Sequence, residues 1–324
     1  MSKKEITLID VKKRIDEEAS KNKDFGSKYG EMTYLGEEGL KIKDNVYEMN
    51  RFAFNNLLYK LKLQKTTVMQ FDDKFRVKMI NERLQNLSAE ECYVRAKENR
   101  LRALFSENYV KYDHQDLIRD LSASNLIDSY FVKRFSIDDY SMKLDLVKKS
   151  EKQNVGLLED GRLDEFEYGF STSNSEIGLY SLNISSFLYR LICTNGAIAR
   201  DELFSIKQKH YGANNVNFSD RVGRLGETTT KLFDKLKVLK ESTITQANDE
   251  FFKTFFDGLR KRDKSFYASK KLREVVANNY ETEKKLTGDN YYTLFNALTR
   301  TARDEENVDK KIILERVAGT FATQ

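Results

Sequence analysis

The stretch Phe166–Arg200, FEYGFSTSNSEIGLYSLNISSFLYRLICTNGAIAR, decides the expected fold. Phe166, Tyr168 and Phe170 stand at alternate positions, and this period of two is typical of a strand with one buried face. A segment rich in Asn, Ser and Gly follows and favours a turn. Residues 179–192 then carry the densest apolar content of the middle region and indicate a second strand.

Upstream of this stretch, strand and helix patterns alternate. Strand patterns occupy residues 29–42, 92–105, 127–137 and 140–147, the first as a strand or hairpin punctuated by glycine. Apolar residues at helical spacing predict helices from about Asn50, over 71–87 and from Asp113 to Leu121. Residues 148–162 are charged and contain glycine, so we expect an exposed hairpin connection or an inserted loop there.

Beyond residue 218 the apolar spacing becomes helical, as in 291–303 and 308–318. Strands that precede helices in this way favour an α+β fold over a doubly wound one. We therefore expect a central, mostly antiparallel sheet with helices packed on it and a helical C-terminal half. The expected organisation is a charged helical extension (1–27), an α+β core (28–218) and a helical region packed on the core (219–324).

Composition narrows the class of protein. Of 324 residues, 17 are Tyr and 21 are Phe, with no Trp and no Pro, so aromatic rings dominate the core and any stacking surface. No run of about 18 apolar residues occurs and the first residues form no apolar leader, which predicts a cytoplasmic protein without a membrane partner. The net charge of +5 permits an acidic partner such as nucleic acid.

Two sets of residues have the types needed for a catalytic or metal site. Cys193 and His210 stand on neighbouring predicted elements, but Cys193 ends an apolar run and cysteine is among the most buried residue types. Asp113, Asp116 and Asp120 fall at helical spacing and could gather a divalent cation for phosphoryl chemistry. Helix capping and a solvated helix face explain these aspartates more simply. We expect no catalytic residue, no metal and no cofactor.

A basic segment carries the strongest functional signal. Residues 221–285 hold 16 Lys and Arg against 10 Asp and Glu, and Phe266 and Tyr267 lie in the densest part. Cations that follow phosphates beside rings that stack on bases are what a single-strand groove requires. The alternative is a solvated helix face whose rings turn inward. Gly223 and Gly226 do not form a Walker A loop, which disfavours a nucleotide-driven motor.

The sequence also resembles a known family. Residues 174–178 (NSEIG), Phe187 and residues 190–196 (RLICTNG), followed by a basic strand that ends at His210, are similar to a phage/plasmid-like family of unknown function. Three further segments look similar and extend the resemblance over about residues 45–320: 102–109 with Asp113, 294–299, and Ala318 with Gly319. The usual N-terminal lead-in of that family is not obvious in residues 1–30.

The resemblance implies a mobile-element setting and a single integrated fold, and it supplies no catalytic residues. Physically, the motif indicates strands and turns, because Gly178 and Gly196 suit tight turns. Arg190, Asn195 and His210 are its candidates for a functional surface. Arg190 stands beside an apolar run and would need a carboxylate or phosphate partner if it were buried.

Three functions follow from these patterns. The leading hypothesis is a non-enzymatic nucleic-acid-binding accessory protein of a phage or mobile element, in the host cytoplasm, with single-stranded DNA as a candidate partner. Its expected contacts are Arg190, Lys207, Lys209, His210, Arg260, Lys261, Arg262, Lys264, Lys270, Lys271 and Arg273. The second is a structural protein that forms a homo-oligomer or binds a host protein. The third is a metal-dependent nuclease that uses the three aspartates.

Overall fold

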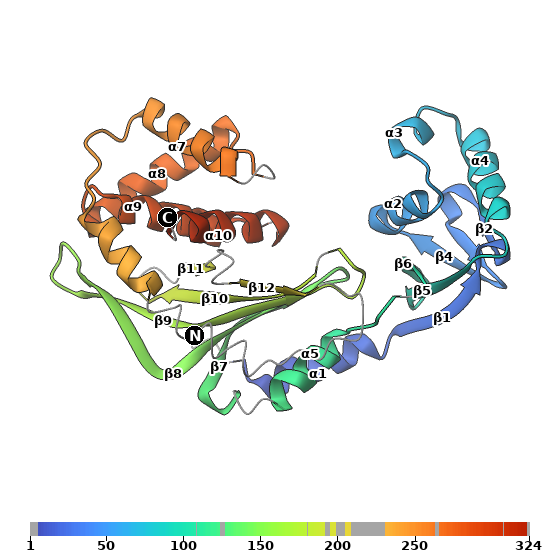
Figure 1. Ribbon diagram of the computed structural model, residues 1–324, viewed down its shortest axis with the longest axis horizontal. Coiled ribbons are helices and arrows are strands. Elements are labelled where there is room, and N and C mark those ends of the chain that lie inside the picture. The colour runs from blue at the N-terminus through green and yellow to red at the C-terminus, as the bar shows by residue number, and fades with distance from the viewer. Residues whose placement is uncertain are drawn as a thin grey trace.

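The protein has two lobes, each built around its own sheet (Figure 1). The computed structural model describes residues 6–107, 109–123, 127–179, 181–191, 195–198, 205–208, 231–262, 266–306 and 308–322. None of the helices in these ranges is both long enough and apolar enough to span a bilayer.

The first lobe contains a six-stranded sheet in the order β1-β5-β6-β4-β3-β2. Its strands are β1 (Asn22–Lys28), β2 (Met32–Tyr34), β3 (Leu40–Ile42), β4 (Asn45–Met49), β5 (Glu91–Lys97) and β6 (Arg100–Ser106), with 3-10 turns η1 (Tyr29–Glu31) and η2 (Gly36–Glu38) around β2. β4 runs parallel to β6, and the other pairs are antiparallel. Helices α2 (Arg51–Lys60), α3 (Lys65–Val68) and α4 (Asp73–Asn86) share one apolar cluster with these strands.

The second lobe contains an antiparallel sheet in the order β11-β10-β9-β8-β7. Its strands are β7 (Tyr130–Ile137), β8 (Met142–Leu157), β9 (Leu163–Asn174), β10 (Leu182–Arg190), β11 (Asn195–Ile198) and β12 (Ser205–Gln208). β11 and β12 both pair with β10, one at each end of it. A 3-10 turn, η3 (Ile127–Ser129), precedes β7.

Two groups of helices pack against the second sheet. Helices α1 (Leu8–Ala19) and α5 (His114–Ala123) cover the end of β8–β10 that holds Met142 and Ile184. The other end, with Val155 and Leu188, packs against C-terminal helices: a helical segment over 231–241, α7 (Asp249–Arg262), α8 (Lys270–Thr287), α9 (Tyr291–Asp304) and α10 (Val308–Ala322). In Figure 1 the C-terminal helices lie above the sheet, and α1 and α5 lie below it.

The first lobe is inserted between two helices of the second. The chain leaves α1, builds the first sheet over 22–106 and returns as α5. Helices α1 and α5 then contact each other, and the Gln115 side-chain amide donates to Asp16 Oδ1 at 2.7 Å. Helices α1 and α5, which are far apart in the sequence, therefore pack side by side against the second sheet.

The expected α+β fold with a helical C-terminal half is confirmed, although it contains two sheets where one was expected. Residues 92–105 form a hairpin and not mainly one strand, because the chain reverses at Glu98, whose φ is 54°. Residues 148–157 continue β8, so no inserted loop forms there, and the expected exposed hairpin connection is confined to the turn over 158–162 between β8 and β9. Lys240 Nζ donates to the Leu157 carbonyl at 2.6 Å, and Val155 is buried, so packing against the C-terminal helices extends this charged strand.

The expected helix at the N-terminus is shorter than its charge pattern indicated. α1 begins after Thr7, whose side chain and Asp10 form a capping box, and it ends before β1 starts at Asn22. Val11 and Ile15 are buried in the cluster shared with α5. The helix is therefore packed on the body of the protein.

Candidate nucleic-acid interface

The connection between α7 and α8 holds Tyr267 out in solvent. Its neighbours Phe266 and Ala268 are buried, while Tyr267 is 69% exposed. Ser269 caps α8 by accepting from the Leu272 amide, and Arg273 Nη1 donates to the Ala268 carbonyl at 3.2 Å. Because both flanking residues are anchored, the backbone that carries the Tyr267 ring is held in place.

One cation lies over this ring, and three exposed lysines stand on the helix ends that the turn connects. The guanidinium carbon of Arg260 lies 5.4 Å from the centroid of the Tyr267 ring, within the range of a cation–π contact. Three exposed lysines stand on the adjoining helix ends, and with Arg260 and Tyr267 they form what we call the α7–α8 surface: Arg260, Lys261, Tyr267, Lys270 and Lys271. Lys270 makes a long ion pair with Glu274 at 3.9 Å. Within the described parts of the chain, no carboxylate pairs with Lys261 or Lys271.

The lysines of α8 stand where helix electrostatics disfavour them. Lys270 and Lys271 are the first two residues of α8, and its first turn has no acidic residue. The positive end of the helix dipole repels a cation there by roughly 0.3–1 kcal/mol. Arg260 and Lys261, at the C-terminal end of α7, are favoured by the dipole of that helix. The helix dipole therefore stabilises the cations at the end of α7, whereas it destabilises the two lysines at the start of α8.

The other residues predicted to contact nucleic acid do not belong to the α7–α8 surface as the structure describes it. Arg273 is half-buried and holds the turn through Ala268, as above. Lys207 lies on β12, where its backbone pairs with Asn183, and Arg262 ends α7, but both side chains lie outside the described residues. Lys209, His210, Lys264 and Cys193 lie wholly outside them, and of Asn195 only its place on β11 is described.

Arg190 is a correction to the predicted interface, because it is 1% exposed and faces the protein interior. Its Nε and Nη2 each donate to Asp164 at 2.7 Å, and its Nη1 donates to Glu283 at 2.7 Å. Tyr292 donates its hydroxyl to Asp164, and Arg300 donates to Glu283. The guanidinium is fully occupied by carboxylates of β9's start and α8, so no phosphate can reach it in this fold.

The three aspartates of the nuclease hypothesis are all engaged. Asp113 pairs with Arg95 at 2.7 Å and Lys111 at 2.9 Å. Asp116, in the first turn of α5, accepts from the backbone amide of Asp113, as the N3 residue of a capping box does. Asp120 accepts from the Tyr112 hydroxyl at 3.0 Å. No cluster of potential metal ligands occurs in the portions of the chain that the structure describes.

A buried charge network joins the two lobes, and sequence reasoning missed it. Arg95 of β5 donates to Asp24 of β1, to Asp113 before α5 and to the backbone carbonyl of Glu176, at 2.6–2.8 Å. Arg102 donates to the Glu176 carboxylate at 2.8 Å. These groups come from four separate segments, so no spacing in the sequence could have revealed their convergence.

His114 lies at the centre of this junction. Its backbone amide donates to Glu176, and its Nδ1 lies 3.3 Å from the Asn174 side-chain nitrogen, which makes Nδ1 the acceptor and places the proton on Nε2. Burial, assisted by the positive charge of Arg102 and Arg95, lowers the pKa of His114 to about 4. Burial would raise the pKa of Glu176, but His114 and then the guanidinium groups of Arg102 and Arg95 outweigh it and lower that pKa to about 2. The pair is a neutral imidazole beside a carboxylate.

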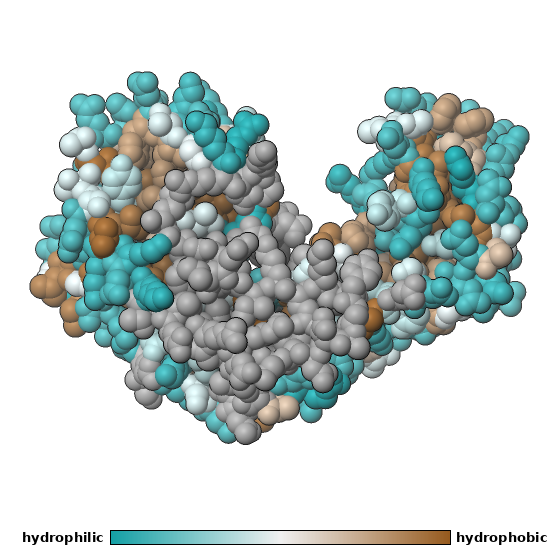
Figure 2. All heavy atoms as spheres, viewed as in Figure 1, coloured by the Kyte–Doolittle hydropathy of each residue, from teal (hydrophilic) through white to brown (hydrophobic). Residues whose placement is uncertain are grey.

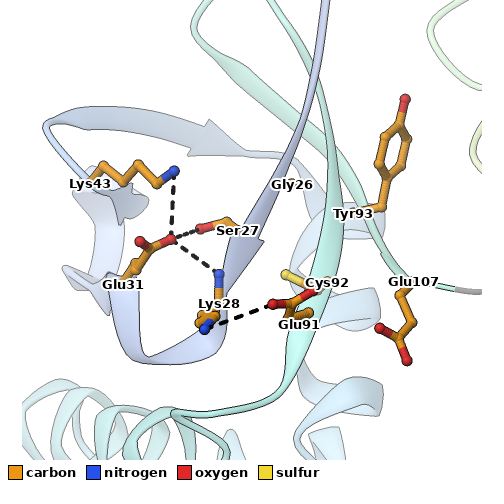
Figure 3. Close-up of a pocket in the computed structure, with 9 residues that line it drawn as sticks. All are labelled: Gly26, Ser27, Lys28, Glu31, Lys43, Glu91, Cys92, Tyr93 and Glu107. Carbon is orange, nitrogen blue, oxygen red and sulfur yellow. Dashed lines mark hydrogen bonds and ion pairs between the residues drawn. The ribbon is translucent and has the colours of Figure 1, made fainter.

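A pocket of about 380 Å³ opens beside β1 and β5 in the first lobe (Figure 3). Two ion pairs cross its rim, Glu31 with Lys43 and Lys28 with Glu91, each at 3.7 Å, and Glu31 also accepts from Ser27 and from the Lys28 amide. Cys92 lies against its floor but is only 3% exposed, and burial raises the pKa of its thiol to about 12. The pocket therefore offers no activated nucleophile.

Comparison of the chain with protein-family models, with curated proteins and with solved structures finds no match.

Proposed function

We propose that this chain is a nucleic-acid-binding accessory protein of a phage or related mobile element, without catalytic activity of its own, that serves replication, recombination or genome protection. The observation that carries the proposal is the α7–α8 surface, where an exposed tyrosine is flanked by an arginine and three exposed lysines. Two of these lysines occupy the positive end of a helix at a cost to its stability. An anionic ligand would offset that cost.

The mobile-element setting rests on the resemblance of residues 174–178 and 190–196 to the phage/plasmid-like family. The residues of that motif that the structure describes are mostly structural. Asn174 and Glu176 belong to the junction around His114, and Arg190 to the buried pairs with Asp164 and Glu283. The motif therefore supports a shared fold, and the binding role rests on the α7–α8 surface.

The test is a fluorescence-anisotropy titration of labelled 20-nucleotide single strands and duplexes at several salt concentrations. Binding through phosphates weakens with salt, and the double variant Lys261→Gln/Lys271→Gln should lower the slope of log affinity against log salt by about 1.4 on single strands. Lys13→Gln/Lys78→Gln is the matched control, because both residues are exposed lysines on helices away from this surface. No binding at low salt, or equal effects of the two double variants, would overturn the proposal.

A second candidate function is protein interaction, and one observation favours it. Figure 2 shows apolar side chains over α3 and α4 at the outer tip of the first lobe. Met69, Phe71 and Phe75 are exposed there, with the two phenyl rings 4.6 Å apart. A self-associating protein would give a mass above 37.9 kDa in light scattering, and Phe71→Ser/Phe75→Ser would return it to the monomer. A concentration-independent monomer of the unaltered chain would count against self-assembly.

A further inference from the structure

We infer that the α7–α8 surface selects single-stranded nucleic acid by stacking an unpaired base on the Tyr267 ring. The inference rests on the proposed function and specifies its ligand. It begins with the geometry of the ring, which is 69% exposed and carries Arg260 over it at 5.4 Å. Among the described residues no second aromatic ring stacks on Tyr267, and the 69% exposure of the side chain leaves ring surface for a ligand.

The burial of its neighbours makes the ring a preorganised platform. Phe266 packs near Phe256, with their centroids 6.1 Å apart, and Ala268 is buried against the same helical core. The backbone around Tyr267 is thus fixed before a ligand arrives, so less ordering entropy is lost on binding. Phe266 and Tyr267 are adjacent in the sequence, yet only the second is available to a base.

The position of the lysines suits a strand whose bases are exposed. Lys261 and Lys271 stand on the two helix ends that the Tyr267 turn connects, and both are exposed. Phosphates of a strand whose base lies on Tyr267 can pair with these cations on either side of the turn. In a duplex both faces of each base are covered by neighbouring base pairs, so the ring has nothing to stack on.

Tyr59 provides an internal comparison. It is 77% exposed on α2 and also has lysine neighbours in sequence, Lys60 and Lys62. Within the described chain, however, no cation lies over its ring as Arg260 lies over Tyr267. Exposure of a tyrosine near lysines is therefore not what distinguishes the α7–α8 surface. The distinguishing feature is the cation held against one face of an anchored ring.

The experiment compares oligonucleotides of equal length: the single strands and the abasic strand carry the same charge and differ in their bases, whereas the duplex carries twice the phosphates. Labelled single-stranded DNA, single-stranded RNA, duplex DNA and an abasic strand of the same length are titrated at one low salt concentration. Stacking of one base should favour the single strands over the abasic strand by about 5- to 150-fold. Tyr267→Ala should reduce that ratio to near one, whereas Tyr267→Phe, which keeps the ring, and Tyr59→Ala should leave it unchanged.

The outcomes separate this inference from the function on which it rests. Equal affinity for single, abasic and duplex strands would overturn base stacking while leaving nucleic-acid binding intact. The same holds if Tyr59→Ala and Tyr267→Ala have equal effects. Failure to bind any strand would overturn the proposed function itself. Circular dichroism of Tyr267→Ala confirms that the variant is folded, as expected for an exposed side chain.

Discussion

Arg190 and Asp164 form a two-point ion pair in the interior of the second lobe, with both donor–acceptor distances at 2.7 Å. Arg190 is the last residue of β10, and Asp164 is the second residue of β9. Glu283 of α8 and the hydroxyl of Tyr292 of α9 complete the pair. The sheet edge and the C-terminal helices are therefore joined by charge as well as by apolar contact.

Replacing Arg190 with Ala should lower the free energy of unfolding by about 3–5 kcal/mol, because it leaves Asp164 and Glu283 as uncompensated buried carboxylates. Urea unfolding followed by circular dichroism measures the change. Arg260→Ala, on the exposed end of α7, is the control and should shift stability by less than about 0.5 kcal/mol. A similar small shift for both variants would contradict the structural role of Arg190.

Acid should destabilise the protein through His114. The unfolded imidazole takes up a proton near pH 6.5 and the folded one near pH 4, because burial lowers the folded pKa. Between these values the unfolded chain binds more protons, so stability falls as pH falls, by about 3 kcal/mol in all. His114→Gln removes this titration and should flatten the unfolding free energy between pH 6.5 and 4. An unchanged slope in the variant would assign the acid sensitivity to other groups.

Cys92 should resist thiol reagents in the native protein. Burial raises the pKa of its thiol to about 12, so almost no thiolate exists near neutral pH. In a Cys193→Ser background, Ellman's reagent at pH 8 should detect no thiol until urea is added. Rapid labelling of the folded variant would show that the floor of the Figure 3 pocket opens.

Gly169→Ala should separate β8 from β9. A Cβ at this position would lie 1.9 Å from the Leu146 carbonyl oxygen, which no side chain tolerates. Overpacking of this kind costs about 1–3 kcal/mol. Gly258→Ala is the matched control: nothing lies within 4 Å of its Cβ in the interior of α7, so it should stabilise the protein by about 0.5–1 kcal/mol. Equal losses in both variants would contradict the close approach of β8 and β9.

Local signals in the sequence predicted much of the fold. Asn50 caps α2 as its chemistry indicated, a helix follows Asp113 although its carboxylate pairs with Arg95 and Lys111, and α9 and α10 follow the apolar spacing of their residues. The extension of β8 to Leu157 could not be predicted in this way. Its charged sequence becomes a strand because helices more than 70 positions later pack against it.

The candidate site also has a part that local sequence predicts and a part that depends on distant residues. Arg260, Lys261, Lys270 and Lys271 are near neighbours in the sequence, and all four are exposed on the adjoining ends of α7 and α8. The burial of Arg190 could not be foreseen, because its partners lie 26 and 93 positions away. The basic segment predicted which residues carry charge, and long-range packing decided which rings and cations remain accessible.

The insertion of the first lobe between α1 and α5 has a consequence for synthesis on the ribosome. α1 is synthesised before the segments that cover it, because Val11 and Ile15 are buried against residues from 117 to 184. The lobe over 22–106 pairs its strands within itself and can fold while α1 still waits for its partners. During that interval the apolar stripe of α1 has none of its packing partners, so this helix is made before the first lobe but is buried only after that lobe is complete.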